Sequence, residues 1–157
     1  MRLPFPPILA TLVLLFAACG GDKSPSSSAD AGGADGPPPL TPFQQENGVG
    51  PITQVVPTGP IDKAMAERGE KTFETTCTGC HKLDERYVGP PLRGVTDRRT
   101  PTYVMNMILA PDTMYTRHPV ARGLLAQFAT QMPNLHLTET QARELMEYLR
   151  EASAEKH

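Results

Sequence analysis

Two thiols and an imidazole lie within five consecutive residues of this 157-residue chain, in the motif Cys77-Thr78-Gly79-Cys80-His81. Thiols at this spacing can each add to one vinyl group of a haem, and the histidine that follows them then falls beneath the iron as a ligand. The chemistry requires both cysteines and the adjacent histidine. The motif therefore predicts one covalently bound haem c, attached through Cys77 and Cys80 and ligated by His81.

Two other uses of the same residues are weaker. A Cys-x-x-Cys redox pair belongs in a βαβ context, and the sequence carries no convincing strand. A zinc site would combine Cys77 and Cys80 with two of the histidines His81, His118 and His136. Such a site needs thiolates that stay reduced. Thiols rarely stay reduced outside the cytoplasm, where the export signal described next is expected to place the protein. Haem attachment is therefore the leading interpretation.

The third cysteine belongs to an export signal. A positive start, Met1-Arg2, precedes an apolar run that ends in the small pair Ala17-Ala18, directly before Cys19. The nine-residue run at 8–16 is too short for the about 20 residues that span a bilayer. The arrangement resembles a bacterial lipoprotein signal, in which residues 1–18 are removed and Cys19 is lipidated. The alternative is a soluble export signal cleaved after the alanines, and both place the mature protein outside the cytoplasm.

Residues 19–60 are interpreted as a tether that leads to a domain at residues 61–157. About half of residues 20–60 are Pro, Gly or Ser, and such a stretch buries too little apolar surface to offset the entropy of ordering it. The more apolar residues 49–56 are expected to lie against the domain as an extended strap. The chain has a net charge of −2, which argues against a nucleic-acid partner.

The domain is predicted to be all-α. Its helices are expected to begin at good caps or at prolines, namely Asp62, Thr100 with Pro101, Pro119, and Thr138 with Gln141 in a capping box. The first helix carries Gly69 and Phe73 on the face that leads to Cys77. The second must stop before Pro111, and residues 111–118 are expected to form a loop. The domain has few aromatic residues, so an apolar cofactor would fill an otherwise thin core.

The residues around the motif resemble the class I c-type cytochromes. The resemblance covers about residues 61–152 and rests on three features: the helix with Gly69 and Phe73, the segment Gly89-Pro90-Pro91-Leu92-Arg93-Gly94, and Met132-Pro133 shortly before the last helix. It implies a helical cytochrome c domain around one haem. The first helix is expected to cross the last one at Gly69, where a missing side chain allows close backbone approach.

The same resemblance implies the remaining site residues. The carbonyl group of Pro90 is expected to accept the second ring N–H of His81, which fixes the tautomer of that ligand. Arg98, or Arg99 in its place, is expected to contact a haem propionate. Met132 is expected to be the sixth iron ligand, since it precedes a proline and the last helix and lies 51 residues after His81.

Several alternatives for the sixth position stay open. Met114 would lie in the predicted loop at 111–118, which can also approach the haem, and His118 or His136 would give a bis-histidine iron. An open position is the last alternative. Met105 and Met107 fall within a predicted helix, where packing is their expected role.

These assignments imply an electron carrier rather than an enzyme. A thioether as the sixth ligand of the iron suits electron transfer, whereas an open sixth position would bind gases or substrate. We expect a monomeric domain that exchanges single electrons with redox protein partners, held on the periplasmic side of a bacterial membrane through Cys19. Residues 82–108 also resemble small lipoprotein cytochromes that accompany nitrous-oxide reductase. The alternatives are a haem sensor or oxidoreductase subunit with a labile or open sixth position, and a haem-free lipoprotein of structural role.

Overall fold

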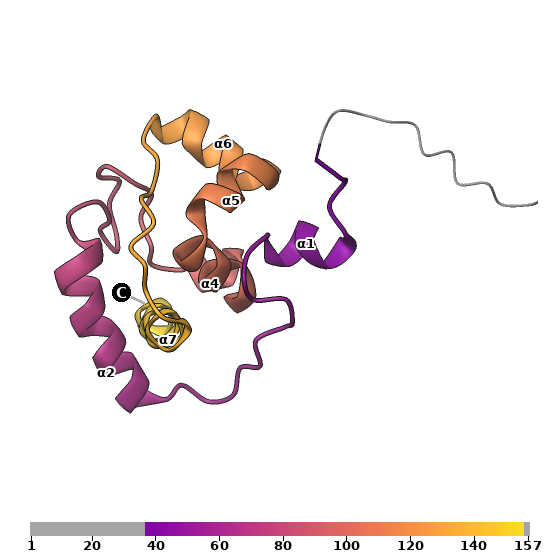
Figure 1. Ribbon diagram of the computed structural model, residues 1–157. Coiled ribbons are helices and arrows are strands. Elements are labelled where there is room, and N and C mark those ends of the chain that lie inside the picture. The colour runs from indigo at the N-terminus through magenta and orange to yellow at the C-terminus, as the bar shows by residue number, and fades with distance from the viewer. Residues whose placement is uncertain (1–36, 156–157) are drawn as a thin grey trace, which may run out of the picture. The chain divides into compact units, whose positions relative to one another are not determined.

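The computed structural model describes residues 37–155, and this part of the chain is helical and contains no strand. Its elements are α1 (Pro42–Asn47), α2 (Lys63–Thr72), the π-helical turn η1 (Phe73–Cys77), α3 (Val95–Arg98), α4 (Pro101–Leu109), α5 (Pro111–Arg117), α6 (Pro119–Phe128) and α7 (Glu139–Ala154) (Figure 1). The all-α prediction is confirmed. Within residues 37–155, no helix combines the length and the apolar character needed to cross a membrane. The predicted signal peptide and Cys19 lie outside the described residues.

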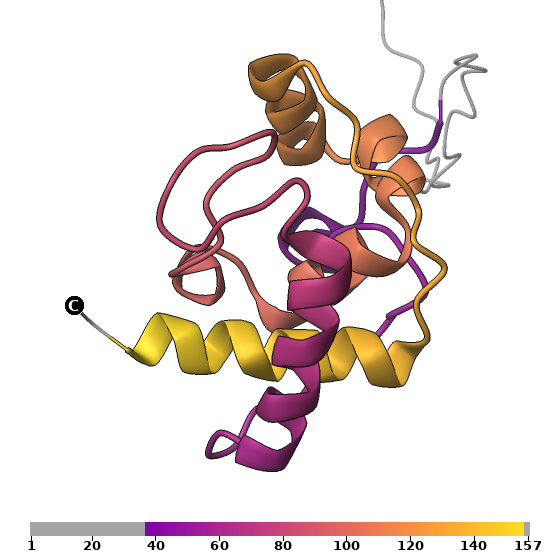
Figure 2. The same ribbon diagram turned by 90° about the vertical axis from the view of Figure 1, so that its left-hand side faces the viewer.

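Helices α2 and α7 cross each other and frame the domain (Figure 2). At the crossing, a Cβ atom on Gly69 would overlap the backbone carbonyl group of Glu144. Only glycine allows this approach of the two backbones. Beside it, the rings of Phe73 and Tyr148 pack with their centroids 5.2 Å apart. The crossing that the family resemblance implied is therefore present.

The main helices begin where the sequence predicted. Asp62 caps α2 and Thr100 caps α4, each by accepting a hydrogen bond from a backbone N–H of the first turn, at 3.0 Å and 3.1 Å. Thr138 and Gln141 form the predicted reciprocal capping box of α7. These bonds satisfy N–H groups that the first turn of a helix leaves without an intrahelical partner.

The chain leaves α2 through the π-helical turn η1, which the sequence did not predict. The N–H of Thr78 donates to the carbonyl group of Phe73 at 3.2 Å, five residues back instead of four. Turns of this kind are frequent at functional sites. Here the turn ends at Cys77, which is half-buried, whereas Cys80 is exposed.

The loop predicted at residues 111–118 is instead helix α5. Pro111 follows the end of α4 and is also the first residue of α5, a position where proline needs no N–H partner and its fixed φ is already helical. Met114 is consequently a fully buried residue of a helix. The prediction was wrong because a proline that stops one helix can start the next.

Part of the predicted tether belongs to the folded domain. Residues 42–47 form α1, and Ile52 is buried in the main hydrophobic cluster. The domain boundary predicted at residue 60 therefore lies too far along the chain, whereas the expectation that residues 49–56 lie against the domain agrees with the structure. We call residues 41–59 the N-terminal strap.

The strap is held by side chains, several of them from α4, rather than by backbone pairing. The buried Asn106 accepts the N–H of Ile52 at 2.9 Å and donates to the carbonyl groups of Ile52 and Asn47, both at 3.0 Å. Thr102 accepts the N–H of Val56 at 2.8 Å. These bonds satisfy backbone groups that an irregular segment would otherwise bury unpaired, and composition alone does not reveal them.

Two hydrophobic clusters lie beside each other around α4. The larger cluster joins the strap, η1, α4 and α7 and contains Ile52, Phe73, Val104, Met105, Ile108, Ala142, Leu145, Met146 and Leu149. The smaller one joins α4, α5 and α6 through Tyr103, Met114, Tyr115 and Ala121. Met105 packs in the core, as predicted.

Candidate functional site

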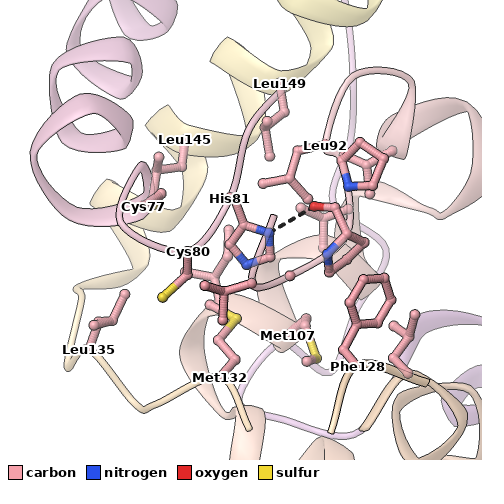
Figure 3. A pocket seen from close by; sticks show the side chains of 18 of the residues that line it. Cys77, Cys80, His81, Leu92, Met107, Phe128, Met132, Leu135, Leu145 and Leu149 are labelled. Atoms are coloured by element: carbon pink, nitrogen blue, oxygen red, sulfur yellow. Dashed lines mark hydrogen bonds between the residues drawn. The ribbon is translucent and has the colours of Figure 1, made fainter. Parts of the chain in front are cut away.

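A largely apolar pocket opens at the end of η1, between α4, α6 and α7. The cysteine and histidine side chains of the motif and the side chain of Met132 line it together (Figure 3). Its apolar lining includes Phe73, Val88, Leu92, Val95, Val104, Met107, Ile108, Leu124, Phe128, Leu135, Leu145 and Leu149. A pocket with an apolar wall and a few polar groups suits a large flat cofactor.

The two cysteines are presented by a tight turn. The N–H groups of Cys80 and His81 both donate to the carbonyl group of Cys77, at 3.0 Å and 2.8 Å. Burial, and then the neighbouring Cys80, raise the pKa of the Cys77 thiol to about 11. Dithiol redox sites instead lower the pKa of their reactive cysteine. The environment of Cys77 thus disfavours the thiol-redox alternative.

The ring of His81 is oriented by the loop that follows the motif. Its Nδ1 atom lies 3.0 Å from the carbonyl oxygen of Pro90, which is the hydrogen bond that the resemblance implied. A carbonyl oxygen can only accept, so Nδ1 carries the proton and the lone pair of Nε2 is left for a metal. Gly89, the residue before Pro90, also lies against the ring, and a Cβ on it would lie 2.5 Å from Cε1.

Arg93 fastens this loop to the end of α7, a role that sequence reasoning missed. Its guanidinium group donates to both carboxylate oxygens of Asp84, at 2.5 Å and 3.2 Å, and to the carbonyl group of Ala152 at 2.5 Å. The planar donor set of arginine suits such a bidentate contact. Nothing in the sequence pattern distinguishes Arg93 from a solvated surface charge.

Two methionines line the pocket, Met132 from the loop before α7 and Met107 from α4 (Figure 3). The sequence predicted the first of these placements, whereas Met107 was expected only to pack. Met114 is fully buried against the strap, where its sulfur accepts the N–H of Val49 at 3.2 Å. It is not among the lining residues, so the structure does not bring it to the pocket.

The other two histidines considered as iron ligands, His118 and His136, also lie away from the pocket lining. His118 is buried, and its Nε2 atom donates to the carbonyl group of Gln45 at 3.0 Å. His136 is exposed in the loop before α7. Across residues 37–155, no three His, Cys, Asp or Glu side chains gather as a metal-binding group. The zinc site considered from the sequence is therefore not assembled.

One rim of the pocket carries two arginines and a tyrosine. Arg98 lines the pocket and donates to the carbonyl groups of Arg93 and Pro91, at 3.1 Å and 3.3 Å. The Arg99 guanidinium lies 5.5 Å from the centre of the Tyr103 ring. The Tyr103 hydroxyl is buried and has no hydrogen-bond partner in the described part of the chain.

The unpaired Tyr103 hydroxyl is a second functional signal that the sequence did not provide. Buried polar groups in folded proteins almost always have a partner. A pocket-lining hydroxyl beside an arginine fits a carboxylate on a bound cofactor, and a haem carries two such groups as propionates. No sequence motif distinguishes Tyr103 from other aromatic residues of the chain.

Comparisons with known proteins agree with this site. The family model described as cytochrome c matches residues 66–153, which is more than half of the chain. A solved cytochrome c from Rhodothermus marinus is 45% identical and superposes with a TM-score of 0.69, over 74% of this chain and 100% of that one. An engineered cytochrome c from the same organism, bound to a carbene intermediate, is 45% identical with a TM-score of 0.65, over 73% of this chain and 99% of that one.

A curated relative is more distant. The cytochrome c-553-like protein of Synechocystis sp. is 33% identical over 52 residues, which are 32% of this chain and 50% of that protein. The match thus spans half the length of that relative. Each of these relatives is a cytochrome c or a cytochrome c-like protein. The match to the family model includes the whole Cys77–His81 motif.

Proposed function

Because the chain belongs to the cytochrome c family, we propose that it is a lipid-anchored electron carrier whose single iron is ligated by His81 and Met132. The cofactor is haem c, bonded covalently through Cys77 and Cys80. One observation carries the ligand assignment: His81, whose Nε2 lone pair would be available to an iron, and the thioether of Met132 line the same apolar pocket.

The cofactor supplies an iron that gains and loses one electron, and a thioether ligand favours its reduced state and raises the potential. The residues of the chain hold that cofactor and shield it. Leu92, Leu145 and Leu149 form part of an apolar wall that keeps water from the iron. Tyr103 and Arg99 are proposed to hold one propionate, and Arg98 to supply further positive charge at the same rim. Cys80 is exposed, so the part of a haem bonded to it would be accessible to redox partners.

The absorption spectrum of the oxidised protein tests the ligand set. We expect the far-red band of a methionine–iron bond in the parent protein, its loss in Met132→Ala, and its retention in Met107→Leu, which removes the second pocket thioether at similar volume. A parent protein without the band, whose reduced form binds carbon monoxide rapidly, would instead be the haem sensor with an open position. Loss of the band in Met107→Leu alone would move the ligand to α4.

Membrane attachment through Cys19 is part of the proposal and rests on the lipoprotein-like signal. An anchor on a Pro- and Gly-rich segment would keep the domain on the periplasmic side near membrane partners and raise its effective concentration there. The full chain expressed in a bacterium should incorporate labelled fatty acid and sediment with membranes, whereas Cys19→Ser should do neither. A soluble parent protein that is cleaved after Ala18 would contradict the anchor.

We further propose nitrous-oxide reductase as the electron acceptor, on the resemblance of residues 82–108 to the small lipoprotein cytochromes that accompany that enzyme. The pre-reduced protein, mixed with catalytic amounts of nitrous-oxide reductase, should be oxidised only after nitrous oxide is added. If the reduced spectrum persists while a small-molecule donor supports turnover, this partner is wrong and the electron-carrier proposal is unaffected.

A further inference from the structure

The loop that carries Met132 is tied by hydrogen bonds to one helix. Residues 130–137 have no regular secondary structure. In the described part of the chain, two hydrogen bonds join this loop to another element, and both end on α5. The backbone N–H of Met132 donates to the Tyr115 hydroxyl at 2.9 Å, and the Gln131 side chain donates to the Asp112 carboxylate at 2.9 Å. Positions 112 and 115 lie on the same face of the helix.

The Tyr115 hydroxyl is a buried polar group whose hydrogen bond goes to the Met132 loop. Tyr115 is buried and lines the pocket, and burial raises the pKa of its hydroxyl. A phenylalanine would fill the same space without burying a polar oxygen. The bond to Met132 is the hydrogen bond found for this hydroxyl among the described residues, and it compensates for burying the oxygen.

Helix α5 is itself held from its other side. The sulfur of Met114 accepts the N–H of Val49, and His118, which directly follows the helix, donates to the carbonyl group of Gln45. The short helix is thereby fixed between the N-terminal strap and the Met132 loop. A fixed donor or acceptor is what allows a second group to be positioned accurately.

We propose that Tyr115 is the positioning residue for the sixth ligand: its hydroxyl holds the backbone of Met132 so that the thioether stays at the iron. The inference rests on the proposed ligation by Met132. It assigns to α5, a helix that the sequence did not predict, the task of resisting displacement of the methionine. The contact is with the main chain, so it positions whichever side chain stands at residue 132.

Displacement of the methionine by imidazole measures this effect. For imidazole to bind the oxidised iron, the loop must move, and in Tyr115→Phe that movement no longer breaks a hydrogen bond. We expect the holoprotein carrying Tyr115→Phe to bind imidazole about three- to ten-fold more tightly than the parent, as the net worth of one hydrogen bond allows. Gln131→Ala, a change at an exposed residue, should shift the affinity in the same direction by a smaller factor.

Tyr148→Phe is the matched control, because the Tyr148 ring packs on Phe73, Tyr148 does not line the pocket, and no hydrogen bond of its hydroxyl is found among the described residues. It should leave imidazole binding unchanged. A Tyr115→Phe protein that unfolds at lower denaturant concentration but binds imidazole as the parent does would overturn the positioning role. If Tyr115→Phe does not fold, an imidazole affinity for Gln131→Ala equal to that of the parent overturns it as well.

The same experiment separates this inference from the ligand assignment. A methionine–iron band that depends on Met132 in the parent protein supports Met132 as the sixth ligand. In that case, unchanged imidazole affinity in Tyr115→Phe and Gln131→Ala contradicts only the positioning role of Tyr115. A parent protein without that band sinks both.

Discussion

Gly89 lies against the imidazole of His81, so closely that a Cβ atom on it would come within 2.5 Å of Cε1 and 2.8 Å of Nδ1. The next residue, Pro90, supplies the carbonyl oxygen that accepts the Nδ1–H. The ring is thus fixed by an apolar contact and by a hydrogen bond from two consecutive residues. Any side chain at position 89 must displace the ring or the loop.

Gly89→Ala is expected to disturb the histidine ligand. The added methyl group forces the ring away from the Pro90 carbonyl, with a loss of about 1–3 kcal/mol of folding free energy as in other overpacked sites. The reduction potential should shift as well, because the bond to Nδ1 tunes the ligand strength of His81. Denaturant unfolding and redox titration of the holoprotein measure both effects. Gly79→Ala is the control within the same motif, since a Cβ there meets no atom within 4 Å.

Gly69→Ala should separate α2 from α7. The methyl group would overlap the backbone of Glu144, and backbone cannot move aside as a flexible side chain can, so we expect a loss of several kcal/mol, at or above the upper end of the about 1–3 kcal/mol found for overpacked cores. Gly123→Ala, in the interior of α6 with no atom within 4 Å of its Cβ, should instead stabilise the protein by about 0.5–1 kcal/mol. Equal thermal midpoints for the two variants would contradict the close crossing.

Asn106→Ala tests whether the strap belongs to the domain. Three hydrogen bonds to the strap backbone disappear, and buried groups of Ile52 and Asn47 lose their partner. We expect a loss of about 1–3 kcal/mol of folding free energy for each group left unsatisfied, measured by urea unfolding.

Truncated chains test the same point. A chain that begins at residue 37 should unfold at the same urea concentration as the mature protein, and a chain that begins at residue 61 should unfold at a much lower one. Equal urea midpoints for the two truncated chains would show that residues 41–60 do not stabilise the domain, as the tether interpretation predicts.

Alkaline pH should destabilise the protein partly through Tyr103. Burial raises the pKa of its hydroxyl, against a smaller opposing effect of Arg99. Above the usual value of about 10 the unfolded chain releases this proton while the folded one keeps it, so stability falls as pH rises, by up to about 1.4 kcal/mol per pH unit. Urea unfolding between pH 9 and 11 should show a shallower fall for Tyr103→Phe. Tyr87→Phe, at an exposed ring, should retain the slope of the parent.

The fold was largely predictable because its signals are local. Helix caps such as Asp62, Thr100 and Thr138 act within one turn, and the haem motif needs five consecutive residues. The regions that prediction missed depend on distant partners. Residues 42–56 look like a tether by composition, and they fold because Asn106 and Thr102, about 50 positions away, satisfy their backbone. Pro111 reads equally as the end of one helix and the start of another.

The sequence by itself determined the covalent chemistry, because two thiols and an imidazole stand in a fixed order at a fixed spacing. The helix crossing at Gly69 and the expectation that Met132 is the sixth ligand came from the resemblance to the class I c-type cytochromes. The tertiary structure alone decided that Met114 and His118 face the strap, that Met107 joins Met132 in the pocket, and that the Tyr103 hydroxyl has no hydrogen-bond partner within residues 37–155. It also decided that Tyr115 reaches the backbone of Met132. Such contacts join residues far apart in the chain, and packing of whole helices, rather than any local preference, brings them together.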